Sequence, residues 1–98
     1  METTTQTGGV SNLNVPDKLD VTESALFKQT LDEVVSSADK IELDFEKTKL
    51  VSSAGIRILL QAEKSTQKAN KSMILKNVSP DVMEIFKITG VDKIFTII

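Results

Sequence analysis

Apolar residues follow two different spacings along the chain, and each spacing predicts a different kind of element. The stretch KIELDFE, residues 40–46, alternates apolar and charged side chains, which is typical of a strand with one buried face. Residues 20–40 instead repeat apolar side chains at helical spacing, which predicts an amphipathic helix capped by Asp20 or Thr22. The apolar stripe of this helix contains Phe27, Leu31, Val34 and Val35.

The central part of the chain predicts a second helix and a second strand. Residues 53–68 again show helical spacing, and residues 71–78, centred on Met73–Leu75, form an apolar run that predicts a strand. Residues 47–51, KTKLV, are expected to be a short connection. The inner side of the second helix is expected to contain Ile56, Leu59, Leu60 and Glu63.

The C-terminal part predicts a third helix followed by a closing strand. Ser79 is a suitable N-cap, Pro80 fits the first helical position, and Gly90 fits the position just after the helix end. The last residues, 93–98 (KIFTII), predict a strand. The inner face of the third helix is expected to contain Val82, Ile85 and Phe86, with Ile88 as a further candidate.

The N-terminal part is less regular. Gly8 and Gly9 are suited to close a hairpin between a weak strand near residues 3–6 and a second strand near residues 10–15, which Pro16 would end. Strands that alternate with helices predict right-handed crossovers. We therefore expect a single α/β domain over residues 1–98, with a mixed, mostly parallel sheet of four to five strands and helices packed against it; residues 1–8 are either the weak first strand or a disordered start.

Composition and charge exclude several functions. The chain has a net charge of −2 and no run of basic residues, and the lysines between positions 64 and 76 are interpreted as a solvated helix end and loop. Nucleic acid is therefore a poor candidate for a partner, because phosphate binding needs a clustered positive face. Neither cysteine nor histidine occurs, which removes disulfides, thiol catalysis and the Ser–His pair that usually activates a serine.

The same composition sets expectations for location and ligands. The N-terminus lacks the basic and apolar regions of a signal peptide, and no apolar run approaches the ~18 residues that a membrane span needs. We therefore expect a cytoplasmic protein without membrane insertion, without a cofactor and without a metal site.

The stretch LVSSAGIRILL, residues 50–60, places small polar residues where a strand ends and a helix begins. Ligands and partners of α/β sheets gather at the carboxyl ends of strands, and the first N–H groups of a helix lack intrahelical partners. One interpretation is structural: Ser52 or Ser53 is an N-cap and Gly55 makes room for packing. The other is that this helix start is a modification or docking site.

Together with two further segments, this stretch resembles the STAS domain family, which is named for sulfate transporters and anti-sigma factor antagonists. LVSSAGIRILL resembles the central Asp-Ser-Ser/Thr-Gly-Leu-Gly-like motif of that family. DKLDVTESALFKQTL resembles its Gly-x-Leu-Asp segment and first helix, and SPDVMEIFKITGVDKIFTI resembles its closing helix, turn and strand. The three matches occur in the family's order and cover most of the chain.

The resemblance assigns roles to individual positions. Ser53 lies where the family has the serine that an anti-sigma kinase phosphorylates, Ser52 where it has an aspartate, and Arg57 where it has a second small residue. Arg57 is then either a solvated side chain or a docking group for an acidic partner residue or for the phosphate. The partner-binding residues implied by the resemblance are Asp20, Ser52, Ser53, Ala54, Gly55 and Arg57.

The function implied by the resemblance is that of an anti-anti-sigma factor, a non-enzymatic switch protein. In its unmodified form it would bind an anti-sigma factor that is also a serine kinase. Phosphorylation at Ser53 would end the contact, a serine phosphatase would reset it, and the free protein would be a monomer. The alternative is a constitutive subunit of a larger assembly, such as a lipid-transport ATPase complex or a signalling scaffold, without phosphorylation.

Overall fold

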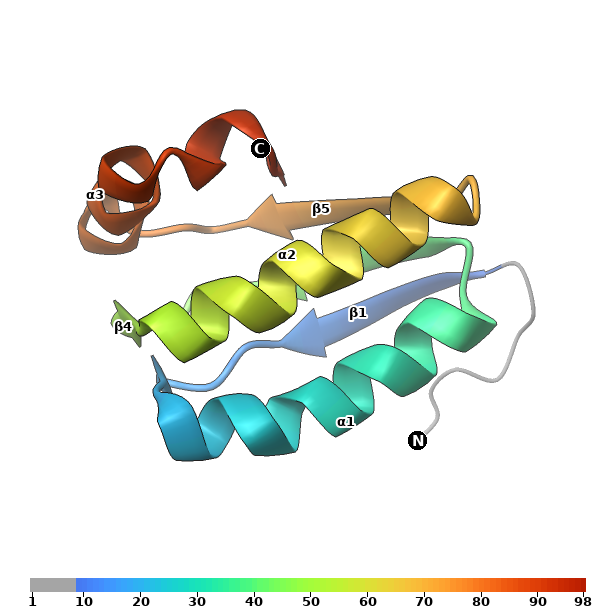
Figure 1. Ribbon diagram of the computed structural model, residues 1–98, viewed down its shortest axis with the longest axis horizontal. Helices are drawn as coiled ribbons and strands as arrows, with labels where there is room; N and C mark the ends of the chain where they lie inside the picture. The colour runs from blue at the N-terminus through green and yellow to red at the C-terminus, as the bar shows by residue number, and fades with distance from the viewer. Residues whose placement is uncertain (1–8) are drawn as a thin grey trace.

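The computed structural model describes residues 9–98 of the chain (Figure 1). Strands and helices alternate, as the hydrophobic pattern predicts. The predicted strand near residues 3–6 and the hairpin that it would form lie outside the described residues. In chain order the elements are β1 (Val10–Asn14), β2 (Lys18–Leu19), α1 (Val21–Ser37), β3 (Lys40–Asp44), β4 (Leu50–Val51), α2 (Ser53–Lys68), β5 (Ser72–Lys76), α3 (Pro80–Thr89), a 3₁₀ turn (Val91–Lys93) and β6 (Thr96–Ile97).

The main sheet has four strands in the order β1-β3-β5-β6, and a second sheet pairs β2 with β4. Every strand pairing within residues 9–98 is parallel. Helices α1 and α2 lie side by side on one face of the main sheet, and α3 lies beyond the carboxyl ends of the strands (Figure 1). The expectation of a mostly parallel sheet with helices packed against it is therefore confirmed.

Alternation in the strands determines which side chains enter the core. In β3 and the residue that follows it, Ile41, Leu43 and Phe45 are fully or almost fully buried, as the KIELDFE pattern predicts. Helix α3 is attached to this core through Phe86. Its ring packs edge-on against Phe45, with ring centres 6.1 Å apart, and against Phe95, with ring centres 5.5 Å apart. Edge-to-face packing is a favourable geometry for aromatic pairs.

Two predicted boundaries are wrong in detail. The connection expected over residues 47–51 contains the short strand β4, because Leu50 and Val51 pair with β2, a partner far away in sequence. Helix α1 ends at Ser37, within the stretch where serines and Asp39 interrupt the helical pattern, so this boundary is confirmed. The closing strand is reduced to β6, because Lys93 belongs to the 3₁₀ turn that follows Gly90, and the N–H groups of Ile94 and Phe95 bond back to the Val91 carbonyl oxygen.

Two expectations about buried helix faces need correction. Ile88 is 77% exposed and lines a shallow groove on the outer side of α3, so it does not belong to the inner face. The inner face is completed by Val91, which follows Gly90 and is buried. In α2, Leu60 is only partly buried, whereas Ile58 and Ala62 enter the core.

The face of the main sheet opposite α1 and α2 is polar and carries a small charged network. Lys76 Nζ lies 3.1 Å from Glu42 Oε1. One Asp44 carboxylate oxygen accepts hydrogen bonds from Asn77 Nδ2 at 3.0 Å and from the Glu46 N–H at 2.9 Å. The Asn77 hydrogen bond is the main reason why the pKa of Asp44 lies below its ordinary value, and the Glu46 N–H and the charge of Lys76 act in the same direction.

We predict that Asn77→Gly raises the pKa of Asp44 toward its ordinary value, as measured by NMR titration. Asn77 has a φ of 57°, which glycine adopts freely, so this change removes the hydrogen bond without straining the backbone. A carboxyl group with a lowered pKa stabilises the fold at pH values above its ordinary pKa. This stabilisation is lost as the pH falls through the lowered pKa. The difference in unfolding free energy between wild type and Asn77→Gly should therefore shrink below about pH 4.

The matched control is Asn70→Gly, because Asn70 has a similar φ of 60°. Its effect on stability should show no corresponding change at low pH. An Asp44 pKa that is unchanged by Asn77→Gly would contradict the assigned cause.

Candidate functional site

The two-stranded sheet brings two helix starts together at one end of the molecule. Leu19 of β2 is in register with Val51 of β4, and the residue that follows each strand is the N-cap of a helix. Asp20 caps α1 and Ser52 caps α2. Figure 1 shows both helices beginning at the end of the molecule where β4 lies, which is also the end of the main sheet where the strands finish. The sequence-predicted site residues therefore lie around two adjacent helix N-termini.

Ser52 is held on both sides of its hydroxyl group. Its Oγ donates a hydrogen bond to the Leu19 carbonyl oxygen at 2.9 Å and accepts one from the Gly55 N–H at 3.3 Å. Its backbone N–H also donates to the Leu19 oxygen, at 2.9 Å. Ser52 is therefore the N-cap that joins β2 to the start of α2, and the structural interpretation of this serine is confirmed.

Ser53 has the opposite environment. It is the first residue of α2 and is exposed, and its side chain makes no hydrogen bond to any group within residues 9–98. The first N–H groups of a helix carry the positive end of its dipole, and the first turn of α2 contains no acidic residue to balance it. Of the two adjacent serines, Ser53 is therefore the one whose hydroxyl is available to another protein.

Gly55 is buried because β2 lies directly against it. A Cβ atom at this position would be 2.8 Å from the Leu19 carbonyl oxygen and 2.9 Å from Leu19 Cγ, which is closer than real contacts allow. The packing interpretation of Gly55 is thus confirmed, and its contact with a partner stays a prediction. Ala54, between Ser53 and Gly55, is half-buried.

Asp20 and Arg57 belong to different helix starts, Asp20 to that of α1 and Arg57 to that of α2. One carboxylate oxygen of Asp20 accepts a hydrogen bond from the Glu23 N–H at 2.9 Å, so the capping role is confirmed for Asp20 rather than for Thr22. Asp20 also lines a shallow pocket with Pro16, Asp17, Lys18 and Glu23. Arg57 is exposed one helical turn after Ser53. A role in partner binding stays a prediction for both residues.

Two residues support the site through contacts that the sequence pattern does not indicate. The Leu19 carbonyl oxygen receives both Ser52 donors, but its importance arises from the pairing of β2 with β4. Thr48 is 1% exposed, and its Oγ1 donates to the carbonyl oxygens of Pro16, at 2.9 Å, and of Val15, at 3.2 Å. Thr48 looks like an ordinary loop residue in the polar stretch EKTK, yet it fixes the segment before β4 to the segment before β2.

Within residues 9–98, no group of three or more His, Cys, Asp or Glu side chains could hold a metal ion. In the same part of the chain, no helix combines the length and the apolar character needed to cross a membrane.

Comparisons with known proteins agree with this description. A family model described as "Mlab, STAS domain" matches residues 2–98. The chain is 32% identical over 81 residues to BtrV of Bordetella bronchiseptica, a protein named as an anti-sigma factor antagonist; the match covers 79% of this chain and 70% of BtrV.

Solved structures show the same fold. One is a Thermotoga maritima protein that is also named as an anti-sigma factor antagonist, with a TM-score of 0.80 and 24% identity over 90% of this chain and 77% of that protein. Another is the anti-sigma factor antagonist SpoIIAA in its unphosphorylated form, with a TM-score of 0.75 and 20% identity over 99% of this chain and 84% of SpoIIAA.

The fold and the site define a class first, that of a small α/β domain in which two capped helix starts lie side by side at the carboxyl end of the sheet. The family model and the similarity to BtrV then show that the chain belongs to the STAS domain family. The resemblance inferred from LVSSAGIRILL and its two companion segments is thus confirmed.

We predict that Gly55→Ala lowers the free energy of unfolding by about 1–3 kcal/mol, because the new methyl group would overlap a backbone carbonyl that cannot rotate away. Urea denaturation measures the change, and Ser53→Ala, at an exposed position, should stay within about 0.5 kcal/mol of wild type. A Gly55→Ala protein as stable as wild type would show that β2 leaves more room. A contact between Gly55 and a partner would be supported only if Gly55→Ala weakens partner binding by more than its loss of stability explains.

A second prediction separates the two serines. Ser52→Ala should lower the free energy of unfolding by about 0.5–2 kcal/mol. The change removes the N-cap of α2 and one of the two hydrogen bonds that Ser52 donates to the Leu19 carbonyl oxygen. Ser52→Thr should recover most of the loss, since threonine retains the hydroxyl. Equal stability of Ser52→Ala and Ser53→Ala would contradict the assignment of the cap to Ser52.

Proposed function

We propose that this chain is an anti-sigma factor antagonist that is switched by phosphorylation of Ser53. The observation that carries the proposal is the difference between the two serines at the start of α2: the Ser52 hydroxyl is engaged on both sides, whereas the Ser53 hydroxyl is exposed and free of hydrogen bonds within residues 9–98. BtrV and SpoIIAA, which share the family or the fold, are named as anti-sigma factor antagonists. A solved structure of SpoIIAA in its phosphorylated form has the same fold, at 19% identity and a TM-score of 0.68.

In the proposed cycle, the unmodified chain binds a kinase-type anti-sigma factor and thereby frees a sigma factor. The contact surface consists of Asp20, Ser52, Ser53, Ala54, Gly55 and Arg57. The kinase then transfers a phosphoryl group from ATP to Ser53 Oγ, whose proton is lost, and ADP leaves. A serine phosphatase hydrolyses the phosphate and restores the binding form. The chain itself catalyses no step, acts as a monomer when free, and works where sigma factors work, in the cytoplasm.

The phosphate changes the surface without a need to unfold it. A phosphoserine adds about −1.5 to −2 charge at neutral pH, and negative charge is favoured at a helix N-terminus. No hydrogen bond of Ser53 within residues 9–98 has to break, and the cap formed by Ser52 stays in place. The contact ends because a charged, strongly hydrated group then occupies the surface that the partner has to cover.

The alternative function is that of a constitutive subunit of a larger assembly, such as a lipid-transport ATPase complex or a signalling scaffold. Residue 52 favours this alternative, because the N-cap of α2 is the neutral Ser52, whereas the antagonist motif has an aspartate at this position. In this case the same helix start would contact its neighbour permanently, and Ser53 would stay unmodified.

The deciding experiment incubates the chain with each kinase-type anti-sigma factor of its source organism and labelled ATP. We expect one kinase to label wild type and Ser52→Thr but not Ser53→Ala. The unmodified chain should bind that kinase, and the phosphorylated chain should bind at least about tenfold more weakly, which corresponds to about 1.4 kcal/mol.

Labelling that persists in Ser53→Ala would contradict the assignment of the acceptor. Stable binding to a transport ATPase subunit or a scaffold, with no labelling by any kinase, would instead support the alternative function.

A further inference from the structure

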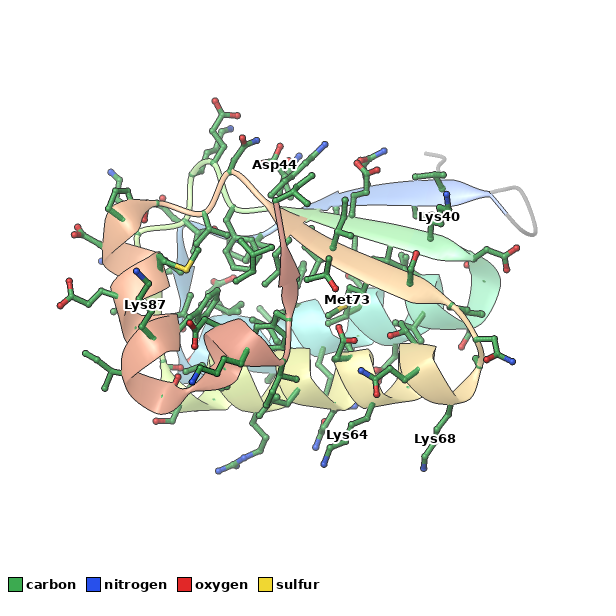
Figure 2. All side chains as sticks on the ribbon, turned by 90° about the horizontal axis from the view of Figure 1, so that it is seen from above. Lys40, Asp44, Lys64, Lys68, Met73 and Lys87 are labelled. Atoms are coloured by element: carbon green, nitrogen blue, oxygen red, sulfur yellow. The ribbon has the colours of Figure 1, made fainter. Side chains whose placement is uncertain are left out.

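The outer face of α2 carries charge of one sign only. Arg57, Lys64 and Lys68 are exposed on this helix, and we call them the basic ridge. The only acidic residue of α2 is Glu63, which is 6% exposed and faces the core. Figure 2 shows Lys64 and Lys68 next to each other, with their side chains directed away from the sheet. The ridge is thus a purely positive surface on a chain whose net charge is −2.

The basic ridge is a continuation of the candidate site. Ser53, Arg57, Lys64 and Lys68 are separated by four, seven and four residues, which places them on one face of an α-helix. At about 1.5 Å per residue, this face runs for about 22 Å from Ser53 to Lys68. A partner that covers Ser53 and extends along α2 would therefore meet all three cations.

Two features of the ridge are unfavourable for the helix that carries it. A positive charge near the N-terminus, as at Arg57, opposes the helix dipole. Lys64 and Lys68 are four residues apart and repel each other. The ion pairs within residues 9–98 are Lys28–Asp32 and Lys76–Glu42, so none of them balances the ridge. Local helix stability therefore does not explain Arg57. Lys68 lies in the last turn, where the helix dipole favours a positive charge, but Lys64 repels it. An acidic partner surface would balance all three cations.

The neighbouring helix indicates which kind of polyanion fits. Helix α1 packs beside α2 and carries Glu23, Asp32 and Glu33 against a single lysine, Lys28, so its charge is −3 + 1 = −2. A flat anionic membrane or a long nucleic acid would meet this negative helix together with the ridge. A folded protein with a local acidic patch can cover α2 alone, so the charge pattern favours a protein.

We propose that the basic ridge docks an acidic patch of the anti-sigma factor, and that phosphorylated Ser53 ends the contact by adding negative charge at the start of the ridge. This inference rests on the proposed function. Arg57 lies one turn from Ser53, within reach of a phosphate there, so the modified serine competes with the acidic partner for the same cation. Phosphorylation then weakens attraction along the ridge in addition to obstructing the surface.

The first test uses the complete chain and the kinase that labels Ser53. Lys64→Glu/Lys68→Glu should weaken binding by at least about tenfold, and wild-type binding should weaken between about 20 and 300 mM NaCl more steeply than binding of this variant. The matched control is Lys40→Glu/Lys93→Glu, which changes the net charge equally at exposed positions. In Figure 2, Lys40 lies on the sheet side of the molecule, away from Lys64 and Lys68. The control should bind the kinase within about twofold of wild type, and this range includes the general effect of the changed net charge.

A second test needs no natural partner. Hexaglutamate is titrated into the isotope-labelled chain at low salt, and NMR shifts should move at Arg57, Gln61, Lys64 and Lys68 more than at Lys40 and Lys93. Shifts spread evenly over all lysines, or equal loss of kinase binding in both charge variants, would overturn the proposal. Failure of every kinase to bind wild type would count against the proposed function, while the peptide titration would still decide whether the ridge attracts acidic protein groups.

A third experiment tests whether the basic ridge binds an anionic membrane instead of a protein. Wild type is mixed with phosphatidylcholine vesicles that contain about one third phosphatidylglycerol and then sedimented. We expect no binding. Sedimentation that requires Lys64 and Lys68, without a response to hexaglutamate, would overturn the proposal and assign the ridge to anionic lipid.

Discussion

The carbonyl oxygen of Leu19 is the point on which the candidate site depends. It accepts hydrogen bonds from the backbone and the side chain of Ser52, and it occupies the space that a side chain at Gly55 would need. The Ser24 hydroxyl also approaches it, at 3.4 Å. One backbone atom therefore joins β2, the start of α1 and the start of α2. Moving this buried carbonyl would lower the free energy of unfolding, because the groups that bond to it would lose their partner in a place where water cannot replace it.

This junction separates a rigid part of the site from an exposed part. Ser52, Gly55 and Thr48 are engaged with the chain itself, and Phe86 holds α3 against the core close to the same end of the sheet. Ser53 and the basic ridge lie on the outside of this scaffold. In the proposed switch, a phosphate on Ser53 would change this exposed part, while the hydrogen bonds beneath it would stay in place. Such a switch would require no second conformation of the domain.

The sequence predicts those features that depend on neighbours in the chain. Alternation in KIELDFE, the N-cap at Ser79 and the glycine at position 90 specify β3 and the ends of α3 through local chemistry, and the structure confirms them. The strand β4, the choice of Ser52 over Ser53 as the cap, and the burial of Thr48 depend on β2, about 30 residues away in sequence. The exposure of Ile88 has the same origin, because the buried face of α3 is set by its contacts with other elements. The motif around Ser53 likewise identifies the family, and helical spacing already places Glu63 on the inner side of α2, where the structure shows it buried.

The two-sided hydrogen bonding of the Ser52 hydroxyl also restricts the mutational paths open to this chain. A hydroxyl can donate to the Leu19 oxygen and accept from the Gly55 N–H at the same time, whereas a carboxylate can only accept. An aspartate at this position would keep the cap but would place its negative charge beside the partial negative charge of the Leu19 oxygen. An aspartate at position 52 would therefore fit best with β2 slightly farther from the start of α2. The preference for a hydroxyl at residue 52 thus depends on the position of a strand that is distant in sequence.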